Sequence, residues 1–179
     1  VVGVFSELVL SKFQKGLNVV PALVFFIPVL MDTGGNAGGQ TCGLIIRALA
    51  LKEFEVKDFP KVVWKEIKTA LLIGLFVGTL AFGVFMIEFS IPGLIKTDLD
   101  ITHKLIVSGI VSLALFCAVV LSKFVACALP FLAVRLKKDP ALTSQPFVTT
   151  IVDVCSLLIY FGIFMIFYVN GFFVNLIPA

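Results

Sequence analysis

Long apolar stretches without charge alternate along the chain with short segments that carry most of the charged residues. A membrane-crossing helix needs about 20 mostly apolar residues, so each uncharged stretch is a candidate span. These stretches are residues 16–31 with 33–46, 69–87, 105–122 and 154–179. Residues 1–11 are apolar but too short to cross, and we interpret them as the tail of a truncated span. The pattern predicts five transmembrane helices per chain, the first truncated and the second broken near Asp32.

Composition leads to the same class of protein. Of the 179 residues, 60% are hydrophobic and 14% are charged, with a mean hydropathy of +1.14. Soluble domains contain about 45–50% apolar and about 25% charged residues, and disordered chains are poorer still in apolar residues. The composition therefore excludes both classes and predicts an all-α integral membrane protein surrounded by a lipid bilayer.

The charged and reactive residues form none of the patterns that nucleic-acid binding, zinc binding or catalysis would need. The net charge of +3 is small and scattered, so no nucleic-acid partner is expected. The four cysteines lie in apolar stretches without a CxxC pattern, which indicates neither a disulfide framework nor a zinc site. No HExxH motif and no nucleophile–base pairing is present, and we therefore expect no enzyme.

The basic residues predict the orientation in the membrane, because cytoplasmic loops are enriched in Lys and Arg. With five alternating spans, one side collects nine of them, namely Arg47, Lys52, Lys57, Lys61, Lys65, Lys68, Arg135, Lys137 and Lys138. The other side carries four, namely Lys12, Lys15, Lys96 and Lys104. We therefore expect a multi-pass protein of the cell (plasma or inner) membrane, with an extracytoplasmic C-terminus.

Asp153 is the most informative residue, because it lies between two long uncharged stretches. A carboxylate at the centre of a membrane helix costs about 2.5–3.5 kcal/mol, and such acids usually mark ion or proton pathways. At helical spacing it shares a face with Thr149, Ser156 and Tyr160. The alternative is an ion pair with Lys123 that serves packing alone.

A glycine-rich run around Asp32 and Asn36 is the second unusual feature. Pro28, Gly34 and Gly35, with further glycines behind them, predict a break in the second helix. Irregular backbone at membrane depth persists where it is buried in protein or lines water, and it then offers carbonyl oxygens to ions. The alternative is a kink that serves only helix packing. Carboxylate, amide, hydroxyl and carbonyl oxygens suit a hard cation such as Mg²⁺ or Ca²⁺.

Several segments, in this order, resemble the transmembrane domain of the MgtE-type magnesium channels. They are PVLMDTGGNAGGQ at 28–40, LIIRALA at 44–50, LPF at 129–131, DPA at 139–141, PFVTTIVD at 146–153 and LLIY at 157–160. These segments extend over nearly the whole chain, so we interpret residues 1–179 as one MgtE-like pore domain. The resemblance implies that the cytoplasmic N-terminal and CBS regulatory domains of that family are absent from this chain.

The resemblance also implies a homodimer with a pore on its two-fold axis, lined by the second and fifth helices. In that family an aspartate of the fifth helix holds a hydrated Mg²⁺, and this aspartate corresponds to Asp153. Backbone carbonyls that contribute to the ion site correspond to Thr149 and Asp32. The implied pore lining comprises Pro28, Gly34, Gly35, Asn36 and Gln145.

The resulting hypothesis is a Mg²⁺ channel pore that passes the hydrated ion down its electrochemical gradient. A second hypothesis is a proton- or ion-coupled secondary transporter of divalent cations such as Co²⁺ or Mn²⁺, in which Asp153 and Lys123 exchange protons. A third is a non-conducting structural subunit of a membrane complex, whose polar stripe only joins helices.

Overall fold

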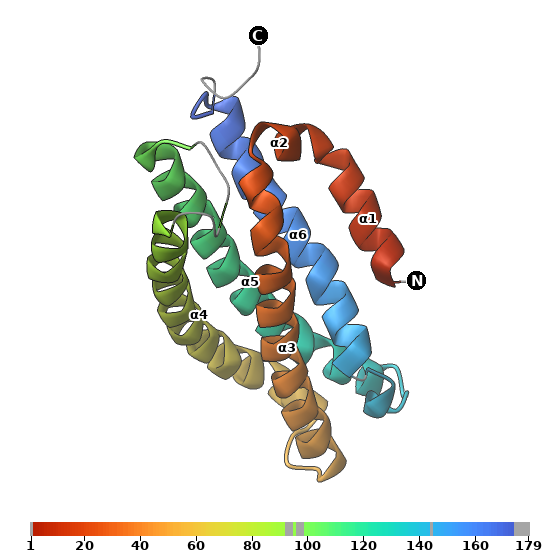
Figure 1. Cartoon of the computed structure of the whole chain (residues 1–179). Coiled ribbons are helices and arrows are strands. Elements are labelled where there is room, and N and C mark those ends of the chain that lie inside the picture. Colours follow the sequence, from red (N-terminus) through yellow and green to blue (C-terminus); the bar gives the residue numbers. More distant parts are fainter. Residues whose placement is uncertain (1, 92–94, 96–98, 144, 174–179) are drawn as a thin grey trace.

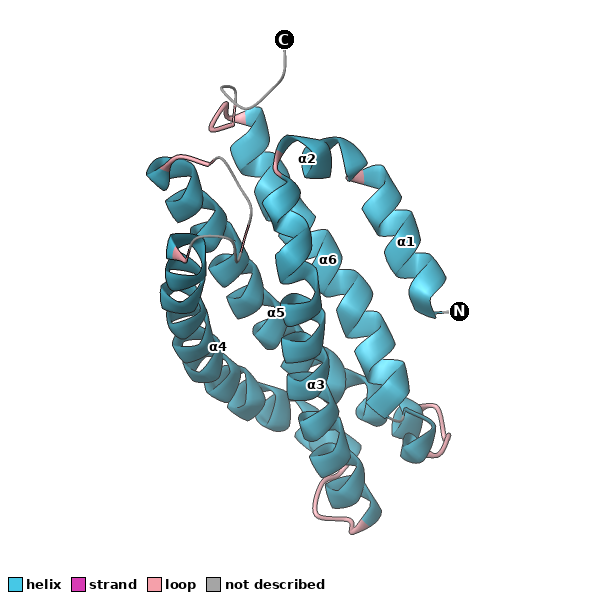
Figure 2. Cartoon of the chain, in the orientation of Figure 1, coloured by secondary structure: helices cyan, strands magenta, loops and turns pink. Residues whose placement is uncertain are grey.

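Helices make up all the regular structure in the described part of the chain, residues 2–91, 95, 99–143 and 145–173 of a computed structural model (Figure 2). The elements in order are α1 (Val2–Lys12), α2 (Gln14–Val19), the 3₁₀ helix η1 (Pro21–Phe26), α3 (Ile27–Ala50), η2 (Val56–Asp58), α4 (Phe59–Ser90), α5 (Ile101–Arg135), η3 (Pro140–Thr143) and α6 (Gln145–Val169). The predicted all-α class is confirmed.

The predicted break in the second span is wrong, because the glycine-rich run lies inside the continuous 24-residue helix α3. Pro28 occupies the first turn of α3, where its missing N–H breaks no helical hydrogen bond. Gly34 and Gly38 are buried against neighbouring helices. A Cβ added at Gly34 would lie 3.0 Å from Cγ1 of Val152, so the missing side chain permits close helix contact. In a helix each glycine is less favourable than alanine by about 1 kcal/mol, and this packing offsets that cost.

Three helical segments are long and apolar enough to cross a membrane: residues 56–90, 101–135 and 146–169. At 24 residues α3 is nearly as long as α6, but its glycines and polar side chains leave it less apolar than these three. Helix α1 has 11 residues, about 16 Å, which is shorter than the hydrocarbon core. The five-span count therefore stays a prediction for α1 and α3.

The long helices pack so that α3, α5 and α6 contact one another and α4 lies against α5 (Figure 1). The α3–α4 and α5–α6 connections, which carry the two basic segments, lie at the same end of the bundle. The opposite end holds α2 and the end of α6. The predicted shared side of the two basic loops agrees with this arrangement.

Close contacts fix the bundle at two places, one between α4 and α5 and one between α6 and η1. Gly78 of α4 is buried against α5, and a Cβ there would lie 3.1 Å from the carbonyl oxygen of Ser112. At the end of the bundle away from the basic loops, the fully buried Tyr160 donates a hydrogen bond of 3.0 Å to the carbonyl oxygen of Leu23. The bond joins α6 to the turn of helix before α3, so it fixes where α3 starts on α6.

Candidate ion-binding site

Glycine brings the backbone of α3 directly against the polar face of α6. A Cβ added at Gly35 would lie 3.3 Å from Cγ2 of Thr149 and 3.6 Å from Oδ1 of Asp153. Asp153 stands one helical turn after Thr149 on α6, so both side chains meet the same stretch of α3. The small residue at position 35 therefore sets the distance between α3 and the Asp153 carboxylate.

An open pocket of about 320 Å³ lies at this contact. Its lining consists of Met31, Asp32, Gly35, Asn36, Thr149 and Asp153. Two carboxylates, one amide and one hydroxyl thus converge on a single site, contributed by the N-terminal halves of α3 and α6. No basic side chain belongs to the lining, so the pocket concentrates negative charge.

Two of the polar side chains that line the pocket donate hydrogen bonds within their own helices. The amide Nδ2 of Asn36 donates to Oδ1 of Asp32 over 3.0 Å. The hydroxyl of Thr149 donates to the carbonyl oxygen of Pro146 over 3.0 Å, within its own helix. Asp153 makes no ion pair with any residue that the structure describes. Its carboxylate therefore remains available to a cation.

The structure brings together most of the residues expected from the sequence. Asp32, Gly35, Asn36, Thr149 and Asp153 line one pocket, although 113 or more positions separate the α3 residues from those of α6.

The remaining expected residues lie elsewhere. Gly34 is buried behind the pocket against Val152 and Ser156. Pro28 is exposed in the first turn of α3, and the side chain of Gln145 lies outside the described residues. Because α3 is continuous, the carbonyl of Asp32 lies within the helical hydrogen-bond ladder, and only its second lone pair can face a ligand.

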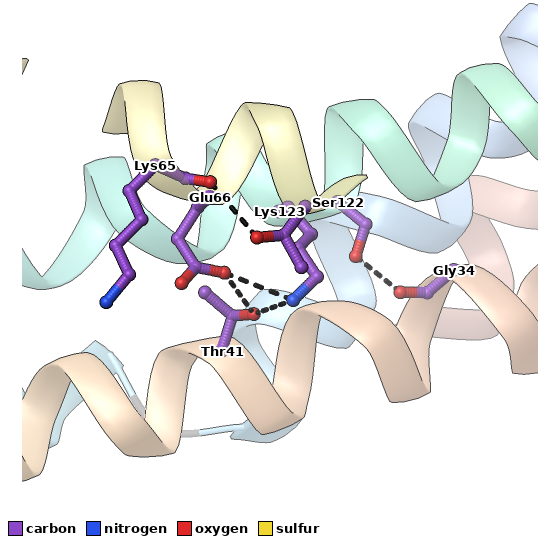
Figure 3. A network of polar contacts seen from close by, with 7 residues as sticks. Gly34, Thr41, Lys65, Glu66, Ser122 and Lys123 are labelled. Atoms are coloured by element: carbon purple, nitrogen blue, oxygen red, sulfur yellow. Dashed lines mark hydrogen bonds and ion pairs between the residues drawn. The ribbon is translucent and has the colours of Figure 1, made fainter. Parts of the chain in front are cut away.

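Lys123 has a partner that the sequence did not identify (Figure 3). Its Nζ lies 3.1 Å from Oε2 of Glu66 on α4 and 2.9 Å from Oγ1 of Thr41 on α3. The hydroxyl of Thr41 in turn lies 3.3 Å from the same Glu66 oxygen. An ion pair of Lys123 with Asp153 for packing alone is therefore not what the structure contains. The sequence indicated only that a lysine inside the membrane needs an acidic partner, and it did not indicate which acid this is.

The donor set suits an ion that keeps its water. Among the described residues, no three His, Cys, Asp or Glu side chains come together in a way that could hold a bare metal ion. Two carboxylates and an amide around an open pocket can instead bind a cation through its hydration shell. Oxygen donors of this kind favour hard cations over soft ones.

Comparison with known proteins gives consistent matches over most of the chain. A family model described as "MgtE: Divalent cation transporter" matches residues 27–163. The magnesium transporter MgtE of Thermus thermophilus is 38% identical over 161 residues, which cover 90% of this chain and 33% of that protein. The magnesium transporter MgtE of Bacillus subtilis is 30% identical over 162 residues, with the same two coverages of 90% and 33%.

A third relative extends the series. The magnesium transporter MgtE of Enterococcus faecalis is 28% identical over 168 residues, covering 92% of this chain and 34% of that protein. The chain thus spans about a third of the length of the curated relatives it matches.

Proposed function

The chain belongs to the MgtE family of divalent cation transporters, and we propose that it forms the membrane pore of a Mg²⁺ channel. The pocket between α3 and α6 carries this proposal, because Asp32 and Asp153 meet there without a basic side chain in the lining. Mg²⁺ would move down its electrochemical gradient along these two helices. The ion is the substrate, and the two carboxylates attract it and exclude anions.

The size of the pocket supports passage of the hydrated ion. Mg²⁺ loses water reluctantly and prefers six oxygen ligands. The pocket, with a volume of about 320 Å³ and open on one side, leaves room for a Mg²⁺ ion that keeps its waters. A carboxylate that contacts these waters can select for a doubly charged ion without removing its shell.

A homodimer would complete the pore. Asp32 and Asn36 are exposed on the surface of the single chain, beside the half-buried Asp153. Polar groups at membrane depth face protein or water, because lipid contact costs about 2.5–3.5 kcal/mol for an aspartate. A second copy across a two-fold axis would cover this face and bring two Asp153 carboxylates to one ion path. Thr149 and the second lone pair of the Asp32 carbonyl would contact the ion's waters.

The position of Lys123 favours a channel over a proton-coupled transporter of Co²⁺ or Mn²⁺. Proton exchange between Asp153 and Lys123 would need the two groups to communicate. Lys123 instead binds Glu66 and Thr41, and none of these three residues lines the Asp153 pocket. The same pocket would serve as the substrate site in a transporter.

The proposal places the protein in the cell membrane as a multi-pass protein. The two basic loops would lie in the cytoplasm and the C-terminus outside, following the excess of basic residues on one side. The relatives are about three times as long, which leaves room for cytoplasmic regulatory domains as partners of the pore in the full-length protein.

Recordings from the protein in planar bilayers test the mechanism. A channel gives discrete single-channel steps in symmetric Mg²⁺, with a current that follows the Mg²⁺ gradient at constant pH. A coupled transporter gives no steps, and its saturable uptake into liposomes rises with an imposed pH gradient. The second result would contradict the channel proposal.

A further inference from the structure

Two consecutive residues of α5 contact α3 at two separate points (Figure 3). The hydroxyl of Ser122 donates a hydrogen bond to the carbonyl oxygen of Gly34, and Ser122 is fully buried. The ammonium group of Lys123 reaches Oγ1 of Thr41 over 2.9 Å. Gly34 and Thr41 are seven residues apart, about 10 Å along a helix. The contacts therefore hold a stretch of about two turns of α3.

This stretch contains two of the four α3 residues that line the ion pocket. Gly35 and Asn36, which line the pocket, lie between the two contact points. The same stretch also contains Gly38 and Gly39, so its own helix propensity is low. The position of this stretch of α3 therefore depends strongly on contacts with other helices.

Glu66 extends the contact to a third helix. Its Oε2 lies 3.1 Å from Nζ of Lys123, and the side chains retain only 20% and 12% of their exposure respectively. Thr41 shares the same carboxylate oxygen. The ion pair, together with the Thr41 hydroxyl, thus ties α3, α4 and α5 together through side chains that are largely buried.

We propose that Ser122, Lys123 and Glu66 form a clamp that positions α3 against α6 and thereby sets the affinity of the pocket for Mg²⁺. The inference rests on the proposed function of the pocket. The three side chains are positioning residues, since none of them lines the pocket itself. They act through Gly35 and Asn36, whose distance from Asp153 depends on where α3 lies.

A neutral double variant separates positioning from stability. Lys123→Met with Glu66→Gln removes both charges together and leaves no unpaired buried charge, a change that proteins often tolerate without loss of stability. The matched control is Lys57→Met with Glu55→Gln, which removes the exposed ion pair of 2.7 Å whose side chains retain 74% and 65% exposure. Both variants lose one positive and one negative charge.

Three quantities are measured for each full-chain variant in detergent or liposomes. They are the half-saturating Mg²⁺ concentration for flux, the amide hydrogen exchange of residues 34–41, and the thermal midpoint. The double variant is expected to raise the half-saturating concentration at least fivefold and to speed exchange in residues 34–41, with a thermal midpoint near that of the wild type. The control is expected to change none of the three.

Unchanged half-saturation and exchange in the double variant would overturn the clamp. A fall in the thermal midpoint with faster exchange in every helix would also overturn it, because the pair would then serve general stability. Absence of Mg²⁺ flux in the wild type would contradict the proposed function, and the exchange of residues 34–41 would still decide whether the clamp holds α3.

Discussion

The side-chain amide of Asn36 donates a hydrogen bond of 3.0 Å to Oδ1 of Asp32, one turn earlier on α3. The bond holds the Asp32 carboxylate at the pocket and leaves Oδ2 without a hydrogen bond among the described residues. In a continuous helix the carbonyl of the same residue is already engaged. Asp32 therefore offers the pocket mainly its charge.

Replacing Asp32 by Asn should weaken Mg²⁺ binding without abolishing flux. The change removes one negative charge per chain from the mouth of the pocket but keeps the size of the side chain. At a distance of about 8 Å and an effective dielectric constant of about 20, the lost attraction for a divalent ion is several kcal/mol before screening by water and salt. We expect the half-saturating Mg²⁺ concentration to rise by about threefold to tenfold after that screening. An unchanged value would show that the carboxylate takes no part.

Replacing Asp153 by Asn should have the larger effect. Asp153 lies deeper, half-buried between α3 and α6, and makes no ion pair among the described residues. We expect Mg²⁺ flux to fall more than about tenfold, since the lost attraction is less screened there, while the thermal midpoint stays the same or rises. The matched control is Asp100→Asn, at the exposed start of α5, which should leave flux unchanged.

Leucine at Gly78 should destabilise the bundle, whereas leucine at Gly83 should not. A Cβ at Gly78 would already lie 3.1 Å from the backbone of Ser112, so a larger side chain must push α4 away from α5. Overpacking of this kind costs about 1–3 kcal/mol or more. Gly83, on the same helix, has no atom within 4 Å of an added Cβ. Thermal unfolding in detergent compares the two variants, and equal midpoints would contradict the α4–α5 contact.

Removal of the Tyr160 hydroxyl should lower stability by a measurable amount. Tyr160→Phe deletes the hydrogen bond to the Leu23 carbonyl in a fully buried site, at a cost of about 0.5–1.5 kcal/mol. Tyr168→Phe is the control, because that side chain is only half-buried and its hydroxyl makes no hydrogen bond with the described residues. A similar loss in both variants would mean that the Tyr160 bond does not fix η1 on α6.

Local periodicity predicted the long apolar helices and placed Thr149 and Asp153 on one face of a helix. The meeting of that face with Asp32, Gly35 and Asn36 was implied only by the resemblance to the MgtE family, because packing brings together residues that are 113 or more positions apart. The prediction of a helix break at the glycine run was wrong because packing against a distant helix overrides the local preference. Its low helix propensity suggests a break, whereas the contacts of Gly34 with Val152 and Ser156 come from a distant helix and offset that preference.

The partner of Lys123 shows a second limit of local reasoning. A lysine inside the membrane needs an acid, but the spacing along the chain does not choose among Asp32, Glu66 and Asp153. Glu66 precedes Lys123 by 57 residues and belongs to a different helix. Only the packing of α4 on α5 selects it.

Anomalous diffraction from crystals of the protein grown in Mn²⁺ tests the central claim most directly, because Mn²⁺ substitutes for Mg²⁺ and scatters anomalously. The account predicts a peak in the pocket between α3 and α6, within reach of Asp153 and Asp32 directly or through one water, which disappears in the Asp153→Asn variant. A peak only elsewhere, such as beside Glu53 and Asp58 at the basic end, or one that persists at full height in Asp153→Asn, would contradict it.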